Sequence, residues 1–519
     1  MSRPVPDPRL QFGHGVPRMG GWAPTETWRT VVTDPTHEQR RPHVVVVGGG
    51  ISGLAAAWRL LRLRTDVDIT VLEGSPDVGG KLRVGELEGI AVDEGAESVL
   101  ATRPEAVSLI REVGLGDDVE HPETTAPRLL LRGELRPLPG GLVMGIPTDL
   151  SVLARSGVLS TQALARLPLD HVLPHTPVEE DISVGEIVGR RLGPEIAARL
   201  VAPLLIGVYA DRVTNVSFRA SMPRVWEAAR QERSLMQAAR STTHARPEGE
   251  APRPVFAGIR GGVGRLPLAL RDRLVAAGVA VETDATVRRL SRRSQGWQLE
   301  VGPTTAPRLV EADAVILAVP APASARLVRG LSVQAETELS EIQTTSVAVV
   351  SMLYRASDLP YGLLPEGSGY LASADEGRPV KASTFSSTKW RWLGDAAAAR
   401  GLVAVRASLG HSADVETLQR DDDELARLAA DDVAFAARLG RARPVASRVT
   451  RWGGGLPQYA VGHVDRVERI IGALDALPGL AVCGATYEGV GIAACVARAD
   501  VAATRVSARL GRDGEWRHG

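Results

Sequence analysis

The sequence predicts an α/β fold that begins with a βαβ unit of the Rossmann type. Residues 43–50, HVVVVGGG, join a β-branched run to three glycines, as in a parallel strand buried on both faces and followed by a tight turn. Residues 51–63, ISGLAAAWRLLRL, continue with the apolar spacing of a helix. Residues 68–75, DITVLEGS, then predict the second strand of the unit.

Size and composition restrict the class of protein. At 519 residues the chain is too long for one ordinary core, so two or three domains are expected. Basic and acidic side chains balance at 61 each, which gives no overall field that favours nucleic acid. Cys483 and Cys495 cannot by themselves form a disulfide framework or a thiolate metal site, and we expect small buried residues in a reducing compartment. The sequence has no run of about 18 uncharged apolar residues, so no transmembrane segment is expected.

The rest of the chain alternates between helical and strand patterns in long blocks. The expected order is a helix at 105–115, a hairpin at 126–145, mainly helices over 150–240, a turn and helix at 261–278, a strand at 312–320, mainly strands over 345–410, a helix at 423–440, and a strand, turn and helix over 480–510. A glycine-rich turn between strand and helix therefore opens the chain, and another closes it.

The first glycine turn predicts a dinucleotide site. Residues 48–53, GGGISG, fit G-x-G-x-x-G, in which the first glycine makes the turn, the second admits a pyrophosphate and the third packs helix on strand. The helix N-terminus offers free N–H groups and positive dipole to the anion. Glu73 follows Gly53 by 20 residues, at the end of the next strand. A carboxylate there accepts the ribose hydroxyls and would repel a 2′-phosphate, so NADP is disfavoured.

Three further motifs suit a longer cofactor. Gly79-Gly80-Lys81 offers a second close backbone approach and a cation, which fits a diphosphate-bearing cofactor, although a plain loop with a surface lysine is the alternative. The motif DEGAES (93–98) has small residues that would let a ring system touch backbone, and a simple turn explains it equally well. In CGATYEGVGIAACVARADVA (483–502), a second helix N-terminus suits the negative charge that a reduced flavin carries at its N1–C2 edge.

Taken together, the motifs resemble the FAD-dependent coproporphyrinogen III and protoporphyrinogen oxidases of the flavin amine oxidase superfamily, and most of all the soluble Gram-positive coproporphyrinogen III oxidases. The pieces that carry the resemblance stand in family order over about residues 43–510: GGGISGLAAA, EGSPDVGGK, DEGAES, FAGIRGGVGRL, ADAVILAVP, STFSSTKW, RWGGGLPQYAVGH and YEGVGI.

The resemblance implies a Rossmann-type FAD-binding domain with an α+β substrate domain and a helical subdomain, as in p-hydroxybenzoate hydroxylase-like architectures. The expected division is a disordered tail at 1–42, a discontinuous FAD-binding domain at 43–125, 255–330 and 445–512, a substrate-binding domain at 126–149 and 331–444, and a helical subdomain at 150–254.

By resemblance, each motif has a place on FAD. The first turn would hold the pyrophosphate with Lys81 nearby, Glu73 would hold the adenosine ribose, and Val287 would meet adenine through its backbone. The DEGAES loop would line the ribityl chain and flavin, Trp452 would pack beside the flavin, and the last motif would bind its pyrimidine edge. The implied cofactor-binding residues are Gly48, Gly49, Gly50, Ile51, Ser52, Gly53, Glu73, Gly74, Gly80, Lys81, Gly95, Ala96, Glu97, Ser98, Val287, Trp452, Val490, Gly491 and Ile492.

The sequence departs from the family pattern at three places. GAES stands where G-P-x-S is commoner, ATYEGVGIAAC replaces a commoner N-x-Y-x-GVGI-x-x-C, and LLIGVYADRV (204–213) lacks a glycine that is usual near Ala210-Asp211. These differences affect local contacts rather than the expectation of FAD.

The activity implied by the resemblance is oxidation of coproporphyrinogen III to coproporphyrin III in cytoplasmic haem biosynthesis. Six electrons would leave in three hydride transfers to flavin N5, with O2 as acceptor giving H2O2, so no catalytic side chain and no metal are expected. The substrate propionates need cations at the pocket rim. Arg103 is the first choice, Lys389 and Arg391 are weaker candidates, and a surface role is the alternative for each.

Several functions remain open on the sequence alone. Protoporphyrinogen IX oxidase is the nearest alternative. A flavin amine oxidase would need a lysine near the flavin, and Lys381 or Lys389 could serve. A non-catalytic FAD-bound tetrapyrrole carrier or scaffold would keep the glycine motifs without turnover. The expected partners are a porphyrinogen and O2, not nucleic acid, and the resemblance leaves open a transient contact with the next haem-pathway enzyme and either a monomer or a homodimer.

Overall fold

The computed structural model describes residues 40–176, 178–243 and 254–515. The predicted tail at 1–42 lies outside the described residues except for its last three positions. Among the described residues, no helix is long and apolar enough to cross a membrane.

A five-stranded parallel sheet joins segments from both ends of the chain. Its order is β12 (Ala280–Glu282), β2 (Asp68–Leu72), β1 (His43–Val47), β16 (Ala314–Leu317) and β22 (Leu480–Val482). The valines of β1 are buried on both faces, as the β-branched run predicts. The predicted βαβ unit is confirmed, because β1 and β2 pair in parallel on either side of α1 (Ile51–Leu63).

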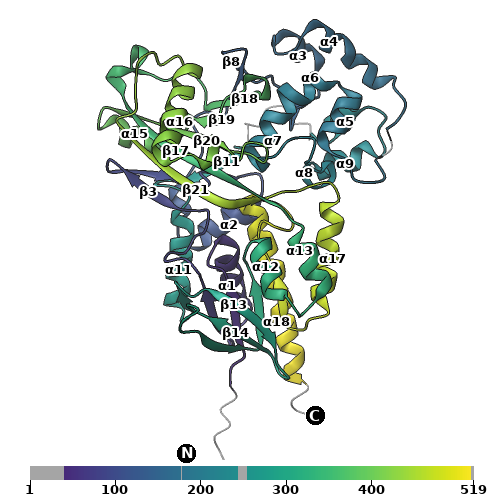
Figure 1. Cartoon of the computed structure of the whole chain (residues 1–519), viewed down its shortest axis with the longest axis vertical. Helices are drawn as coiled ribbons and strands as arrows, with labels where there is room; N and C mark the ends of the chain where they lie inside the picture. Colours follow the sequence, from purple (N-terminus) through teal and green to yellow (C-terminus); the bar gives the residue numbers. More distant parts are fainter. Residues whose placement is uncertain (1–39, 177, 244–253, 516–519) are drawn as a thin grey trace, which may run out of the picture. The chain divides into compact units, whose positions relative to one another are not determined.

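Helices cover one face of this sheet, and strands with further helices cover the other. On the first face, α1, α11 (Arg265–Ala276) and α18 (Ile492–Glu515) share a core with Val44 and Val46. Figure 1 shows α1 and α18 side by side. On the second face, Val45 and Val47 share a core with a three-stranded antiparallel sheet and three helices. These elements are β13 (Val287–Arg292), β14 (Trp297–Val301), β15 (Arg308–Ala312), α12 (Ala321–Val328), α13 (Val333–Ser340) and α17 (His463–Asp475).

A seven-stranded sheet forms the second layer of strands. Its order is β21 (Ala446–Pro457), β17 (Thr344–Arg355), β20 (Leu402–Leu409), β19 (Val380–Thr384), β18 (Gly369–Ala372), β7 (Arg128–Leu131) and β8 (Glu134–Pro137). Strands β7 and β8 form the predicted hairpin, and α16 (Asp422–Ala436) covers one face of the sheet. Strand β21 pairs with β17, although the predicted boundary groups residues 445–512 with the dinucleotide-binding segments.

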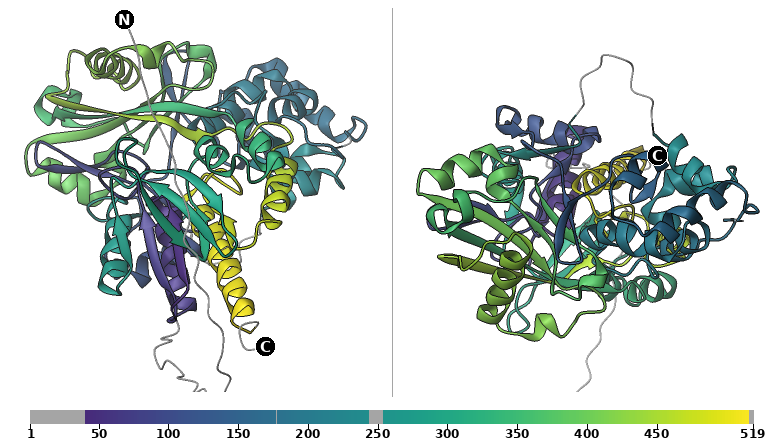
Figure 2. Two further views of the ribbon diagram at one scale, coloured as in Figure 1. Left: turned by 60° about the horizontal axis from the view of Figure 1, so that its bottom comes forward. Right: turned by 90° about the horizontal axis from the view of Figure 1, so that it is seen from above.

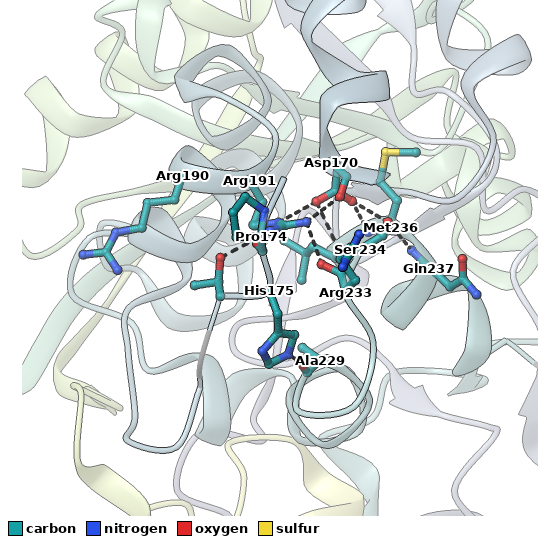
Figure 3. A network of polar contacts seen from close by, with 12 residues as sticks. Asp170, Pro174, His175, Arg190, Arg191, Ala229, Arg233, Ser234, Met236 and Gln237 are labelled. Atoms are coloured by element: carbon teal, nitrogen blue, oxygen red, sulfur yellow. Dashed lines mark hydrogen bonds and ion pairs between the residues drawn. The ribbon is translucent and has the colours of Figure 1, made fainter. Parts of the chain in front are cut away.

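The segment predicted to be helical builds a further core, which it shares with Leu129 and Leu131 of β7 and with Tyr459. Figure 2 shows in both views that its helices (blue to teal) gather to one side of the large sheet (green). They are α3 (Leu150–Arg155), α4 (Thr161–Arg166), α5 (Val184–Arg191), α6 (Pro194–Ile196), α7 (Ala202–Tyr209), α8 (Phe218–Ser221), α9 (Pro223–Ala229) and α10 (Leu235–Ser241). A buried polar network around Asp170 and Arg191 links the loops between them (Figure 3).

The remaining elements connect these layers. They are β3 (Val84–Leu87), β4 (Ile90–Asp93), β5 (Val99–Leu100), α2 (Pro104–Glu112), β6 (Val119–Glu120), β9 (Leu142–Val143), β10 (Ile146–Pro147), β11 (Phe256–Ile259), α14 (Ser386–Lys389) and α15 (Arg391–Ala398). Helices α14 and α15 interrupt the segment 345–410, which the sequence predicts to be mainly strands.

Helix α7 ends in a conformation that explains one departure from the family pattern. Its C-terminal Ala210 has φ 51° and ψ 37°, in the left-handed region that favours glycine. The glycine that the resemblance leads us to expect near this position would suit this conformation, which Ala210 adopts here.

Candidate functional site

The glycine turn before α1 is held against the end of β2 by Glu73. The Glu73 Oε2 accepts a hydrogen bond from Gly49 N at 2.6 Å, and Oε1 accepts one from Ser75 N at 2.8 Å. A Cβ at Gly53 would lie 1.8 Å from the Gly48 carbonyl oxygen, so helix and strand pack here without room for a side chain. The third glycine of the motif therefore has the packing role predicted for it.

The loop carrying Gly79 and Gly80 lies directly against this turn. Gly79 N donates to Gly49 O at 2.9 Å, and a bridge pairs Gly79 with Gly50. The Lys81 ammonium donates to Gly455 O on β21 at 2.5 Å, and burial lowers its pKa. The predicted place of Lys81 near a pyrophosphate remains a prediction, since its present partner is a carbonyl.

The DEGAES loop packs between Lys81 and Trp452. Ala96 N donates to Lys81 O at 3.2 Å, and Trp452 Nε1 donates to Glu94 O at 2.9 Å. A Cβ at Gly95 would lie 1.7 Å from Lys81 O and 3.3 Å from the Trp452 ring. The structure thus brings together residues that the sequence separates by more than 350 positions.

The glycine turn before α18 lies beside the glycine turn before α1. The Cys483 thiol lies 3.8 Å from Ser52 O in the first turn of α1, and a Cβ at Gly484 would lie 3.9 Å from Ser52 Oγ. Tyr459 fixes the loop that leads into α18, because its hydroxyl accepts from Gly489 N and donates to Ala485 O, each at 2.7 Å. The positive ends of two helices therefore converge at one place.

His463 supports this arrangement from the interior. Its ring stacks on Tyr459 with a centroid distance of 3.9 Å, and burial lowers its pKa to about 4. The sequence reveals the PQY-x-x-GH motif but not this role, because the contact with residues 485–489 exists only in the folded chain.

A buried charge cluster adjoins the DEGAES loop. Lys389 Nζ lies 2.5 Å from Glu97 Oε1, and Arg406 Nη1 lies 3.5 Å from Glu97 Oε2. Arg406 also donates to Gly95 O. Burial raises the pKa of Glu97 most strongly, but the charges of Lys389 and Arg406 outweigh it, so this pKa lies below its usual value.

Asp93, at the start of the same loop, serves another element. Its carboxylate accepts hydrogen bonds from Val263 N at 3.0 Å and Gly264 N at 3.1 Å, at the N-terminus of α11. Burial raises its pKa to about 6, against the hydrogen bonds from Gly264 and Val263. Sequence reasoning missed both Arg406 and the capping role of Asp93.

The remaining predicted residues lie in different surroundings. Val287 begins β13, and the preceding Ala285 N donates to Glu73 O at 2.8 Å, which places this segment beside the end of β2. Arg103 is 44% exposed and pairs with Glu105 at 2.7 Å. Arg391 is 68% exposed and pairs with Glu123 at 2.6 Å. Neither arginine joins the buried cluster around Glu97.

The residues present fit a long dinucleotide cofactor. A Cβ at Gly50 or Gly491 would meet no atom within 4 Å, and one at Gly80 would meet only Gly50 Cα at 3.4 Å. Glycines from three motifs therefore border open space next to two helix N-termini, with a fixed carboxylate at the end of β2. Such a cradle offers N–H donors to phosphates and an acceptor to ribose.

The comparison with known families agrees with this geometry. Residues 51–507 match the family described as flavin containing amine oxidoreductase. The chain belongs to this family. The chain has the fold of the flavin amine oxidases, and FAD is the cofactor of this flavin oxidoreductase.

Individual relatives cover nearly the whole flavin oxidoreductase. It is 37% identical over 464 residues to the coproporphyrinogen III oxidase of Mycobacterium tuberculosis (strain H37Rv). The alignment covers 89% of this chain and 96% of the relative. The chain is 30% identical over 467 residues to the coproporphyrinogen III oxidase of Bacillus subtilis (strain 168). This alignment covers 88% of this chain and 96% of the relative. A crystal structure from Exiguobacterium sp. 255-15, assigned as a protoporphyrinogen oxidase, aligns with a TM-score of 0.78 and 28% identity over 90% of this chain and 99% of that chain.

Proposed function

We propose that this flavin oxidoreductase oxidises coproporphyrinogen III to coproporphyrin III, as a step in haem biosynthesis. The observation that carries the proposal is the 37% identity to the Mycobacterium tuberculosis coproporphyrinogen III oxidase over 96% of that enzyme. The family motifs that distinguish this group, including the Trp452 to His463 stretch, lie at the cradle described above.

FAD, when bound, accepts the electron pairs removed from the substrate. The chain's own residues hold and orient it. The N-terminus of α1 would face the pyrophosphate, and the Glu73 carboxylate would accept from the adenosine ribose. The N-terminus of α18, with Val490, Gly491 and Ile492, would face the pyrimidine edge and stabilise negative charge there.

The protein side of the reaction is positioning and exclusion of water. Trp452 and the DEGAES loop, which pack on each other, form a wall for the flavin in this proposal. No described side chain is assigned as a base. The proposed final acceptor is O2, giving H2O2, and six electrons leave the substrate in three two-electron steps.

Substrate recognition requires cations, because coproporphyrinogen carries four propionates. Arg103 remains the first candidate, since its guanidinium is exposed and pairs with the partly exposed carboxylate of Glu105. Location in the cytoplasm is part of the proposal, and the two free, buried cysteines fit a reducing compartment.

Protoporphyrinogen IX is the second candidate substrate. The observation that favours it is the alignment with the Exiguobacterium structure assigned as a protoporphyrinogen oxidase. An amine substrate is less well supported, since Lys389 is paired with Glu97 and the Lys381 ammonium donates to Gly410 O at 2.7 Å.

The deciding experiment supplies purified FAD-loaded protein with coproporphyrinogen III, protoporphyrinogen IX or benzylamine, first without oxygen and then in air. Flavin bleaching reports electron transfer, and porphyrin fluorescence reports product. We expect faster bleaching and fluorescence with coproporphyrinogen III. Faster reaction with protoporphyrinogen IX would replace the substrate within the same chemistry, and bleaching by the amine alone would reject both porphyrinogens.

A further inference from the structure

The buried cluster of Glu97, Lys389 and Arg406 joins the large sheet to the DEGAES loop. Arg406 lies on β20, and its cross-strand neighbour on β19 is Thr384, whose side chain also bonds to Glu97. Lys389 ends α14, and the side chains of all three cluster residues are 14% exposed. Three elements of the sheet region therefore meet a single carboxylate on the loop.

The ion pair with Glu97 argues against binding of a substrate propionate by Lys389, the role considered from the sequence. Its ammonium lies 2.5 Å from Glu97 Oε1 and 5.2 Å from the centre of the Trp390 ring. A lysine that binds a substrate carboxylate must have its ammonium free to reach it. Here the ammonium already pairs with Glu97, and releasing it would leave this carboxylate with only the longer 3.5 Å contact to Arg406 as its ion pair, which is unfavourable in a partly buried place.

The surroundings of the cluster are poorly solvated, so its charges are weakly screened. Arg406 Nη1 and Trp390 Nε1 are buried and donate no hydrogen bond to any described residue, although Nη1 keeps its longer ion-pair contact with Glu97. Both residues line a cavity of about 20 Å³, which has room for about one water molecule. Charges in such a place act over several ångströms far more strongly than charges on the surface.

We propose that Lys389 and Arg406, fixed by Glu97, raise the reduction potential of the bound flavin. Both cations are attached to the loop that is predicted to line the flavin, and Arg406 bonds the loop backbone at Gly95. Fixed positive charge near a flavin favours the reduced form, which carries the additional negative charge. Lys389 is then a positioning residue that tunes the cofactor, and the substrate propionates are bound by other cations. The inference rests on FAD binding and not on which porphyrinogen is oxidised.

The test is a redox titration of the FAD-loaded protein without substrate and without oxygen. We expect Lys389→Gln to lower the flavin potential and Glu97→Gln to raise it, while Lys389→Arg keeps the parental value. A tenfold change in the ratio of affinities for reduced and oxidised FAD corresponds to about 30 mV for a two-electron couple. The matched control is Arg400→Gln, which makes the same charge change at an exposed residue in the turn after α15. Its potential should equal that of the parent.

Steady-state kinetics distinguishes tuning from substrate binding. If Lys389 binds a propionate, Lys389→Gln raises KM for the porphyrinogen and leaves the potential unchanged, which overturns the proposal. Lys389→Gln could fail to take up FAD. In that case Lys389→Met, which fills a similar volume without charge, replaces it in the comparison of flavin potential with the parent. If Lys389→Gln or Lys389→Met binds FAD and keeps the parental flavin potential, the tuning role is rejected. Because no substrate is present in the titration, its result does not depend on the proposed reaction.

Discussion

The guanidinium of Arg191 and the carboxylate of Asp170 form an ion pair at the centre of the helical region, with Nε and Oδ1 2.6 Å apart. Their side chains are 3% and 0% exposed. Asp170 also accepts from Ser234 Oγ and Met236 N, which places its charge at the N-terminus of α10 (Figure 3). Arg191 donates to the carbonyls of Pro174 and Arg233, so both charged groups of the pair have further hydrogen-bond partners.

We expect Asp170→Asn to lower the free energy of unfolding by about 3–5 kcal/mol, because it leaves a buried guanidinium without its counter-charge. Urea denaturation followed by circular dichroism measures the change. The control is Glu186→Gln, which breaks the exposed pair with Arg190 on the same helix and should cost at most about 0.5 kcal/mol. Equal losses from both variants would contradict the buried-pair argument.

The hairpin between β7 and β8 offers a stabilising substitution. Its two turn residues, Arg132 and Gly133, have φ of 56° and 73°, the pattern of a type I′ turn, which favours Asn-Gly. Arg132 is exposed, and its backbone N–H, not its side chain, bonds Glu376. Arg132→Asn should therefore raise the free energy of unfolding by about 0.5–1 kcal/mol in urea denaturation. Arg329→Asn makes the same change at an exposed residue with φ −56° and should give no gain. A gain of the same size there would assign the effect to charge rather than to turn geometry.

The cofactor end of the fold was predictable because its signals are local. The spacing of Gly48, Gly53 and Glu73 sets the turn, the helix packing and the position of the carboxylate within one βαβ unit. The Glu97 cluster was not predictable, since Lys389 and Glu97 lie 292 residues apart and meet only when the large sheet packs on the DEGAES loop. The sequence offered Lys389 as a weaker candidate for substrate binding, with a surface role as the alternative, because a lone motif lysine gives no sign of a distant partner. Tyr459 shows the intermediate case, in which the motif is visible and its hydrogen bonds are not.

Burial of Asp93 predicts a defined dependence of stability on pH. Its pKa in the folded protein is raised to about 6 from 3.8, so the folded state binds a proton more tightly than the unfolded state does. The free energy of unfolding contributed by this group is therefore greatest below pH 3.8 and is lost as pH rises to about 6. The full loss corresponds to about 3 kcal/mol.

Asp93→Asn should remove this loss. The amide oxygen can still accept from Val263 N or Gly264 N, and no charge forms at neutral pH. The free energies of unfolding of parent and variant are measured by urea denaturation at pH 4.5 and pH 7.5. The difference between the two proteins at each pH cancels the contributions of the other titrating groups. We expect the variant to gain stability relative to the parent between the lower and the higher pH. A difference that does not change with pH would show that Asp93 keeps an ordinary pKa.

Substitution by alanine should have different effects at two glycines of the first motif, lowering FAD affinity at Gly50 and stability at Gly53. A Cβ at Gly50 meets no atom within 4 Å, so Gly50→Ala should fold normally while its methyl group enters the space proposed for the pyrophosphate. We expect its FAD affinity to fall at least tenfold, or about 1.4 kcal/mol, in a flavin fluorescence titration of the apoprotein. A Cβ at Gly53 would lie 1.8 Å from Gly48 O, so Gly53→Ala should lower the free energy of unfolding by about 3 kcal/mol.

Gly472→Ala on α17 is the matched control, because its Cβ also meets nothing within 4 Å and its position is exposed on a helix remote in sequence from the motif. It should leave FAD affinity unchanged and raise stability by about 1 kcal/mol through helix propensity. Parental FAD affinity in Gly50→Ala would mean that the open space beside Gly50 does not receive the cofactor. Loss of folding in Gly50→Ala would mean that the space is closed by packing, and the distinction between the two glycines would then fail.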